Sequence, residues 1–269
     1  MNIYSNVGVS VKTLTFCSFK GGTGKTTLSL NVGCNLAQEK KKRILLVDLD
    51  PQANLTIGLG IQTCEKYSLN EFLRNTNEIK NSIHKTKINN LDIIPSSVLI
   101  EEFRGFNKVT NLAINHLYLS LQSIQDYYDI CILDTPPSLG ILTREAFLAS
   151  QYLIICLTPE PFSILGLQKI KEFCSTIEND LEVLGIVFSF WDERNSTNSM
   201  YTDIIESIYP NKILESKIRR DITLSRSLLK ETPVINAYPN SRASQDILKL
   251  TQEIENKLSL HQKTIQESL

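Results

Sequence analysis

The feature that most constrains the fold is a glycine-rich loop between an apolar run and a segment with helical periodicity. The apolar run spans Leu14 to Phe19, and the periodic segment spans Leu28 to Leu36. The loop contains Lys20, Gly21, Gly22, Thr23, Gly24, Lys25, Thr26 and Thr27. A strand, a glycine-rich turn and a helix in this order form a phosphate cradle, because backbone N–H groups turn inward and the helix dipole faces the anion. The loop therefore predicts a nucleotide-binding α/β fold.

The polar residues of the loop have distinct expected roles. We expect Lys25 to contact the β- and γ-phosphates of the nucleotide and the Thr26 hydroxyl to coordinate Mg²⁺. The common phosphate-loop pattern places a glycine five residues before its last glycine. This chain has Phe19 there instead, followed by a second lysine, Lys20. The loop is therefore a variant of the common motif.

Strand-like and helix-like segments alternate along the chain. The strand-like runs are Leu14–Ser18, Ile44–Val47, Leu91–Ile94, Ile130–Leu133, Tyr152–Leu157 and Val183–Phe188. The helix-like segments are Lys25–Glu39, Asn111–Gln125, Leu139–Ala149, Ser163–Glu178 and Ser199–Ile208. Most strand-like runs are continuously apolar, which is typical of strands buried on both faces of a parallel sheet. The alternation predicts a doubly wound, mostly parallel sheet with helices on both faces.

The composition is that of an ordinary globular protein. The 269 residues are 42% hydrophobic and 21% charged, and no repeat or low-complexity segment divides them. We expect one domain over residues 1–269, with a short N-terminal extension at 1–10 and a frayed tail at 259–269. The six cysteines are scattered, and no apolar run approaches the roughly 20 residues of a membrane span. These features indicate reduced thiols and a cytoplasmic location.

Aspartates follow two of the predicted strands. Asp48 and Asp50 follow the second strand, and Asp134 follows the fourth. Each motif alone can be a simple turn, but ligands of doubly wound sheets bind at the carboxyl ends of the strands. We expect Asp48 and Asp50 to face the same side, where a carboxylate holds the water shell of Mg²⁺ or orients the attacking water, and Asp134 to bind Mg²⁺. No Asn-Lys pair continues into the guanine-recognition signature, so the expected nucleotide is ATP.

The loop and the two aspartate motifs together resemble the ParA/Soj/MinD family of DNA-partition and positioning ATPases, which carry a deviant Walker A loop. The segments that carry the resemblance are 20–27, 48–54, 90–95, 134–138 and 159–166. The resemblance extends from about Lys12 to Glu255. Within the family it is greatest to ParA-like members carried on chlamydial plasmids, at Ser189 to Asp192 and at Ile218 to Asp221.

The resemblance implies an ATPase that forms a homodimer with two ATP molecules between the subunits. In this family the lysine that corresponds to Lys20 crosses the dimer interface and touches the nucleotide of the other subunit. The resemblance further implies that Asp50 positions the hydrolytic water, while Asp48 and Asp134 bind Mg²⁺ together with Thr26. It also implies slow intrinsic turnover, which a ParB-like DNA-binding partner stimulates.

A basic segment contrasts with the net charge of −1. From Lys212 to Lys230 there are six basic and two acidic residues, and six minus two is a local charge of +4. Such a segment is either a solvated face or a contact for a phosphate backbone. The resemblance implies that the ATP-bound dimer binds duplex DNA without sequence preference, although Thr223 replaces one arginine of the relatives. The candidate DNA-binding residues are Arg194, Arg219, Arg220 and Arg226.

Other functions share parts of this pattern. A plasmid-encoded regulator of gene expression would use ATP-dependent DNA or protein binding, but only about ten residues precede the first strand, too few for a helix-turn-helix domain. A MinD-like ATPase would bind a membrane through a C-terminal helix. The helix expected at Ser244–Leu260 has a polar face of mixed charge and no aromatic anchor, so we expect it to pack on the domain. The resemblance favours a partition ATPase and implies that it associates with the nucleoid in its ATP-bound form.

Overall fold

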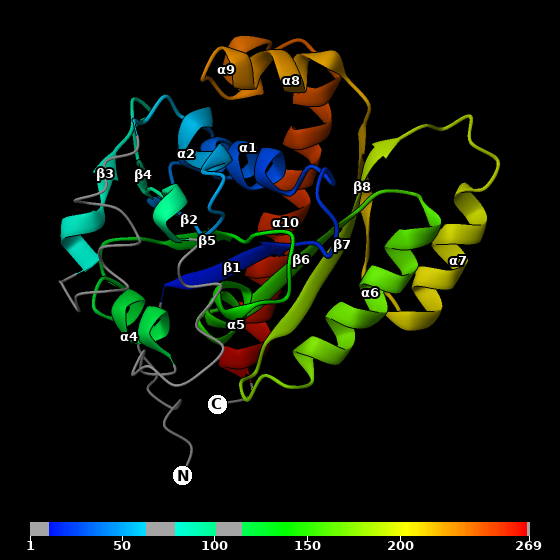
Figure 1. Cartoon of the computed structure of the whole chain (residues 1–269), viewed down its shortest axis with the longest axis horizontal. Coiled ribbons are helices and arrows are strands. Elements are labelled where there is room, and N and C mark those ends of the chain that lie inside the picture. Colours follow the sequence, from blue (N-terminus) through cyan, green and yellow to red (C-terminus); the bar gives the residue numbers. More distant parts are fainter. Residues whose placement is uncertain (1–10, 63–78, 101–114, 268–269) are drawn as a thin grey trace.

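The structure is a computed structural model that describes residues 11–62, 79–100 and 115–267. Strands and helices alternate along these residues (Figure 1). The strands are β1 (Lys12–Cys17), β2 (Ile44–Asp48), β3 (His84–Lys85), β4 (Leu91–Ile94), β5 (Ile130–Asp134), β6 (Tyr152–Leu157), β7 (Glu182–Trp191) and β8 (Ile213–Arg219). The helices are α1 (Lys25–Gln38), α2 (Asn54–Gly58), the 3-10 helix η2 (Ile79–Ser82), α4 (His116–Gln122), α5 (Ile141–Leu148), α6 (Pro161–Cys174), α7 (Asn198–Ile208), α8 (Ile222–Leu229), α9 (Val234–Ala237) and α10 (Arg242–Glu267).

These strands form one sheet in the order β3-β4-β2-β5-β1-β6-β7-β8. Neighbouring strands are parallel except for β3 and β4, which are antiparallel. The predicted doubly wound α/β fold is confirmed. The chain leaves β1 through α1 toward one edge of the sheet and leaves the adjacent β6 through α6 toward the other edge. A crevice opens where connections diverge in this way, so the fold places the loops after β1 and β6 at a ligand-binding position.

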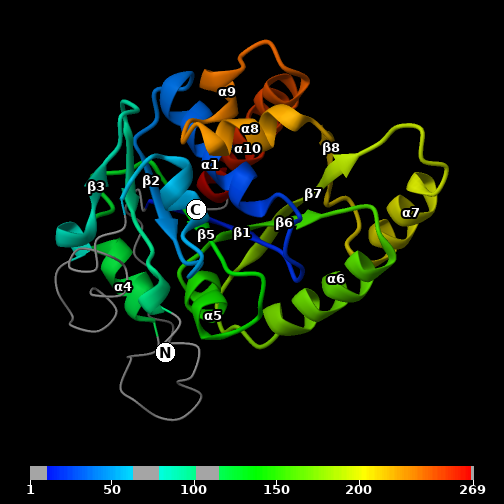
Figure 2. The same cartoon turned by 45° about the horizontal axis from the view of Figure 1, so that its top comes forward.

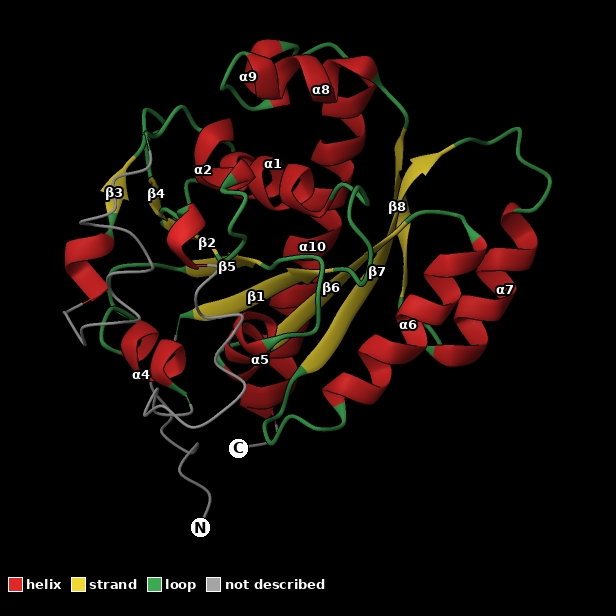
Figure 3. Ribbon diagram, in the orientation of Figure 1, coloured by secondary structure: helices red, strands yellow, loops and turns green. Residues whose placement is uncertain are grey.

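The sheet separates two helical layers (Figure 3). Helices α1, α2, α8, α9 and α10 contribute to one apolar cluster, and α4, α5, α6 and α7 contribute to the other. Figure 2 brings α1, α8 and α10 forward on their side of the sheet. The two clusters take alternate residues of the strands, because successive side chains of a strand point to opposite faces.

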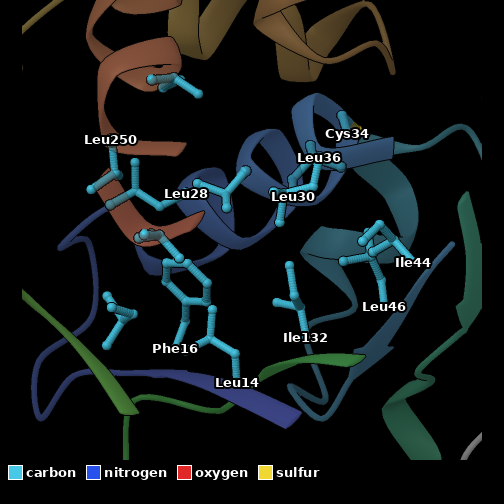
Figure 4. Close-up of a cluster of buried hydrophobic side chains, with 14 of the residues drawn as sticks. Leu14, Phe16, Leu28, Leu30, Cys34, Leu36, Ile44, Leu46, Ile132 and Leu250 are labelled. Carbon is cyan, nitrogen blue, oxygen red and sulfur yellow. The ribbon is translucent and has the colours of Figure 1, made fainter. Parts of the chain in front are cut away.

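The layer that contains α1 fixes the glycine-rich loop at its two ends. Leu14 and Phe16 of β1 pack beneath Leu28 of α1, and Leu250 of α10 closes the same cluster (Figure 4). All four side chains are 0–1% exposed. Complete burial of side chains of this size contributes about 1.5–3 kcal/mol each. The loop is therefore held between a rigid strand and a rigid helix.

The strands β8 and β3 and the short helices α2, α8 and α9 were not predicted from the sequence. Strand β8 lies within the basic segment and pairs only with β7, so it is an edge strand. Edge strands tolerate charged residues that protect them from pairing with other chains, which explains why β8 lacks the continuous apolar pattern. The short β3 lies in the polar region before β4. The helix expected over 111–125 is described from His116 onward, and residues 111–114 lie outside the described part.

Helix α10 packs on the domain as expected. Ile247, Leu250, Ile254 and Leu258 are 0–2% exposed and belong to the core beside α1. Residues 259–267 of the expected tail belong to α10, which continues to Glu267 without a glycine or proline. Among the described helices, none has the length and apolar character needed to cross a membrane.

Candidate functional site

The glycine-rich loop has the geometry of an anion cradle. Gly22 and Gly24 adopt left-handed conformations, with φ of 77° and 81°, which glycine accommodates without steric cost. A Cβ atom at Gly21 or Gly22 would meet no atom within 4 Å, so the loop borders open space. Gly24 is the N-cap of α1 and supplies no side-chain acceptor to the first turn of that helix. The N–H groups of that turn therefore suit an anionic ligand.

Lys25 begins α1 and places its ammonium among buried carboxylates. It is 6% exposed, and its Nζ lies 3.3 Å from Asp134 Oδ1 and 3.5 Å from Thr26 Oγ1. Burial opposes the charge of this lysine, but the carboxylates of Asp134 and Asp50 outweigh burial and raise the pKa of Lys25. Lys25 is therefore a stable cation at the base of the cradle.

The ends of β2 and β5 bring two aspartates together. Asp48 and Asp134 are register partners in these adjacent strands, and both are 0% exposed. Burial and the neighbouring Asp134 carboxylate raise the pKa of Asp48 to about 7. Burial also raises the pKa of Asp134, against the opposing effect of the Lys25 ammonium. The site thus concentrates negative charge around one buried lysine.

Asp48 and Asp134 differ in how their oxygens are used. Asp48 Oδ1 accepts a hydrogen bond from the Asp50 N–H, and its Oδ2 accepts from the Thr56 N–H and hydroxyl, at 3.1, 2.9 and 2.7 Å. These bonds secure the turn that leads from β2 into α2. In contrast, Asp134 Oδ2 is buried and has no hydrogen-bond partner within the described residues. Asp134 is therefore better arranged as a metal ligand than Asp48.

The residues around Asp134 fit a Mg²⁺ ion bound together with a nucleotide. Mg²⁺ is usually held by one or two carboxylates, a hydroxyl group and phosphate oxygens. The Thr26 hydroxyl and the Asp134 carboxylate both lie within reach of the Lys25 ammonium, at 3.5 and 3.3 Å, so a hydroxyl and a carboxylate lie together beside the cradle. The unpartnered Oδ2 of Asp134 is the carboxylate oxygen that remains available as a ligand for Mg²⁺. Asp50 lies close to Lys25 and is 5% exposed, and its Oδ1 accepts a hydrogen bond from the Gln52 N–H.

Lys20 lies outside this buried cluster. Its Nζ donates to Glu160 Oε2 at 2.6 Å, and the two side chains are 50% and 46% exposed. Glu160 follows β6 and is the N-cap of α6. The two lysines of the loop therefore differ, since Lys25 faces the interior of the site and Lys20 faces solvent and the β6–α6 loop.

An arginine-rich cleft of about 840 Å³ lies next to Glu160, between the loops that follow β6, β7 and β8. The arginines that line it are Arg194, Arg219, Arg220 and Arg242. Arg219 donates to Asp246 from Nε at 3.0 Å and from Nη2 at 2.6 Å, so its guanidinium is tied to α10. Arg194 pairs with Asp192 and remains 90% exposed. The Arg220 guanidinium lies 5.7 Å from the centre of the Phe190 ring.

The four arginines predicted to bind DNA are thus not equivalent. Arg220 and Arg194 line the cleft with exposed side chains, and Arg226 is exposed on α8 outside it. Arg219 lines the cleft too, but its pairing with Asp246 gives it a structural role.

Sequence reasoning did not assign roles to Glu160, Thr56 or Phe190. Glu160 follows a strand at the carboxyl edge of the sheet, and this position was a signal that could have identified it. Phe190 has a left-handed backbone, with φ of 55°, at an irregularity in the pairing of β7 with β8. A bulky residue in this conformation is strained. No local sequence pattern predicts that strain.

Comparisons with known proteins agree with this architecture. A family profile described as an AAA domain matches residues 11–183. The virulence plasmid ParA family protein pGP5-D of Chlamydia psittaci is 74% identical over 96% of this chain and 100% of its own length. The protein of the same name from Chlamydia trachomatis is 60% identical over 92% of this chain and 95% of its own length. A plasmid partition protein of Borrelia burgdorferi bound to AMPPNP is similar in structure, with a TM-score of 0.78, 24% identity and coverage of 93% and 99% of the two chains.

Proposed function

Because the chain belongs to the ParA family of partition ATPases, we propose that it binds and hydrolyses ATP with Mg²⁺ to drive partition of plasmid or other DNA. The observation that carries the proposal is the buried cluster of Lys25, Asp50 and Asp134 beside an open glycine cradle. Phosphoryl transfer to water needs a cation at the phosphates, a metal ligand and a group that orients the water. This cluster has one residue for each of these tasks.

In this proposal Lys25 contacts the β- and γ-phosphates, and the N–H groups from Gly21 to Thr27 surround them. Thr26 and Asp134 hold Mg²⁺, with Asp48 supporting the turn that carries Asp50. When bound, Mg²⁺ neutralises the charge that develops on the phosphates. Asp50 orients the attacking water.

A homodimer is the second part of the proposal, with ATP between the subunits and Lys20 reaching the nucleotide of the partner. The direction of Lys20 supports this, since its Nζ pairs with Glu160 and Lys25 serves the site of its own subunit. The surface beside Glu160 also carries apolar side chains, Phe162 and Leu165, which are 70% and 55% exposed. Aromatic side chains are enriched at protein–protein interfaces, so Phe162 is compatible with an interface here. A cation supplied across the interface stabilises transition-state charge as an arginine finger does.

The third part concerns DNA and the stimulating partner. We propose that the ATP-bound dimer binds duplex DNA through Arg194, Arg220 and Arg226, and that the dimer is then nucleoid-associated in the cytoplasm. A ParB-like protein bound to the cargo DNA stimulates hydrolysis, after which the dimer opens and leaves the DNA. Intrinsic hydrolysis is slow, because the partner completes the active arrangement. The exposure of the three arginines supports their contact with phosphates.

The Asp50→Ala variant tests this proposal. It should bind Mg²⁺-ATP, dimerise and retain DNA, because the cradle and Lys20 are intact, but it should not hydrolyse ATP. Hydrolysis is measured by phosphate release, and duplex DNA binding by fluorescence anisotropy at increasing salt, with and without a ParB-like protein from the same replicon. Wild-type turnover by Asp50→Ala, or DNA binding that does not weaken with salt, would contradict the proposal.

A further inference from the structure

The ion pair between Lys20 and Glu160 joins two loops at the crevice of the sheet. Lys20 follows β1 and Glu160 follows β6, and these two strands are neighbours. We infer that Glu160 is a positioning residue that holds Lys20 within its own subunit, so that this ion pair opens before Lys20 reaches a second subunit. The inference rests on the proposed ATP-bound dimer and adds a control on its formation.

The backbone before Lys20 is anchored in a way that favours this pair. The Phe19 side chain packs on α6 at Gly166, where an added Cβ would lie only 2.9 Å from Phe19 Cβ. Lys169 of α6 lies 4.7 Å from the centre of the Phe19 ring. The Ser18 hydroxyl also donates to the Lys20 carbonyl at 2.9 Å. Because Phe19 is fixed against α6, Lys20 is presented to the N-terminal end of that helix, where Glu160 lies.

The pair is suited to opening. Both side chains are about half exposed, and ion pairs at such positions shift an equilibrium by only about 1.4- to 5-fold. A lysine that contacts nucleotide phosphates makes stronger, charge-assisted hydrogen bonds. The contact with Glu160 is therefore weak enough for ATP in a second subunit to replace it as the partner of Lys20. Until then, the contact lowers the fraction of molecules in which Lys20 is free to reach a second subunit.

The charged residues around Glu160 also reduce the electrostatic cost of separating it from Lys20. Glu160 lines the arginine-rich cleft, and two arginines of that cleft, Arg220 and Arg242, form no ion pair within the described residues. The four arginines of the lining outnumber its three carboxylates, Glu160, Asp192 and Glu193, so the cleft keeps a net positive charge after the lysine leaves. Opening the pair therefore does not leave Glu160 among carboxylates alone.

The Glu160→Gln variant tests the inference, because it removes the carboxylate and keeps the size of the side chain. A dimer contains two such pairs, so the dissociation constant of the Mg²⁺-ATP dimer should fall by about two- to thirty-fold. It is measured by analytical ultracentrifugation at a series of protein concentrations. Glu160→Asp retains the charge on a shorter side chain and should fall between the wild type and Glu160→Gln.

A matched control is Glu182→Gln. Glu182 accepts a hydrogen bond from Lys212 at 2.8 Å, with side chains 36% and 32% exposed, at the amino end of β7, away from the carboxyl ends of the strands where Lys20 lies. This variant loses a comparable ion pair and should leave the dimer constant unchanged. A second readout is the rate at which an amine-acylating reagent labels Lys20 in nucleotide-free protein, followed by mass spectrometry. Glu160→Gln should increase that rate, because the ammonium no longer has a carboxylate partner.

The outcomes separate the inference from the proposed function. If the wild type dimerises with Mg²⁺-ATP and Glu160→Gln dimerises equally well or less well, Glu160 does not restrain Lys20 and the inference is wrong. If neither protein dimerises with Mg²⁺-ATP, the proposed dimer is wrong and the inference falls with it. An equal effect of Glu182→Gln would also overturn the inference, since the change would then follow net charge.

Discussion

Lys25 should stabilise the folded protein in the absence of nucleotide, and Lys25→Met tests this. Methionine keeps the length of the side chain but removes the ammonium that lies 3.3 Å from Asp134, in a site where both residues are at most 6% exposed. Removing one partner of a buried ion pair costs about 3–5 kcal/mol, because the other charge stays buried without compensation. The cost is large here because Asp48 and Asp50 add further negative charge nearby. This loss is a large fraction of the roughly 5–15 kcal/mol that stabilises a typical domain.

The destabilisation should depend on pH. Without Lys25, the folded-state pKa of Asp134 rises further above its unfolded value of about 3.9. A carboxylate with a raised pKa binds more protons in the folded state, so stability falls as pH rises from the unfolded to the folded pKa. Lys25→Met should therefore be closest to the wild type below the unfolded pKa of about 3.9 and should fall further behind it as the pH rises. Asp48, with its pKa raised to about 7, gives the wild type a slope of the same sign.

The assay is urea unfolding of nucleotide-free protein at several pH values. Lys25→Met combined with Asp134→Asn should regain most of the lost stability, because the uncompensated carboxylate is gone. Lys212→Met breaks an exposed pair and should cost about 1 kcal/mol or less. If Lys25→Met unfolds within about 1 kcal/mol of the wild type at pH 8, the buried charge balance assigned to this site is wrong.

Three further predictions concern the loop and the arginines. Gly24→Ala should lower the melting temperature and ATP affinity, since its φ of 81° is left-handed and the new Cβ lies 3.2 Å from Ser189 Oγ. Asp246→Ala should lower the free energy of unfolding in urea by about 1–3 kcal/mol, because Arg219 loses its acceptor. Arg220→Ala should change that free energy by less than about 0.5 kcal/mol but reduce the salt slope of DNA binding, measured by anisotropy, by about 1.

The sequence predicted the positions of the glycine-rich loop and of the aspartates well, because these positions depend on local order. A continuous apolar strand, a glycine-rich turn and a helix specify the cradle, and parallel strands bring their carboxyl ends to one edge. These two facts place Lys25, Asp48, Asp50 and Asp134 near one another without any tertiary information. The sequence could not predict which carboxylate oxygens are used in hydrogen bonds within the protein and which stay available for a metal ion. Thr56 reaches Asp48 only because the turn into α2 folds back, eight residues along the chain.

The basic segment could be predicted less well. A charge count assigned Arg219 to DNA, but its partner Asp246 lies 27 residues further on, in a helix that packs beside β8. Strand β8 was missed for a related reason. It is an edge strand and carries charged residues, so it lacks the continuous apolar run by which the buried strands were recognised. Partners brought together by packing between distant elements, such as Lys20 and Glu160, 140 residues apart, leave no local pattern.

The central claim is that Lys20 acts in the other subunit, and mixing two inactive variants tests it most directly. Lys20→Ala and Asp50→Ala should each lose ATP hydrolysis. In a mixed dimer, the subunit with Lys20→Ala keeps its own Asp50 and receives Lys20 from its partner, so one of two sites is complete. Random pairing then predicts up to about a quarter of wild-type hydrolysis from an equal mixture. A mixture no more active than its two components would show that Lys20 acts only within its own subunit.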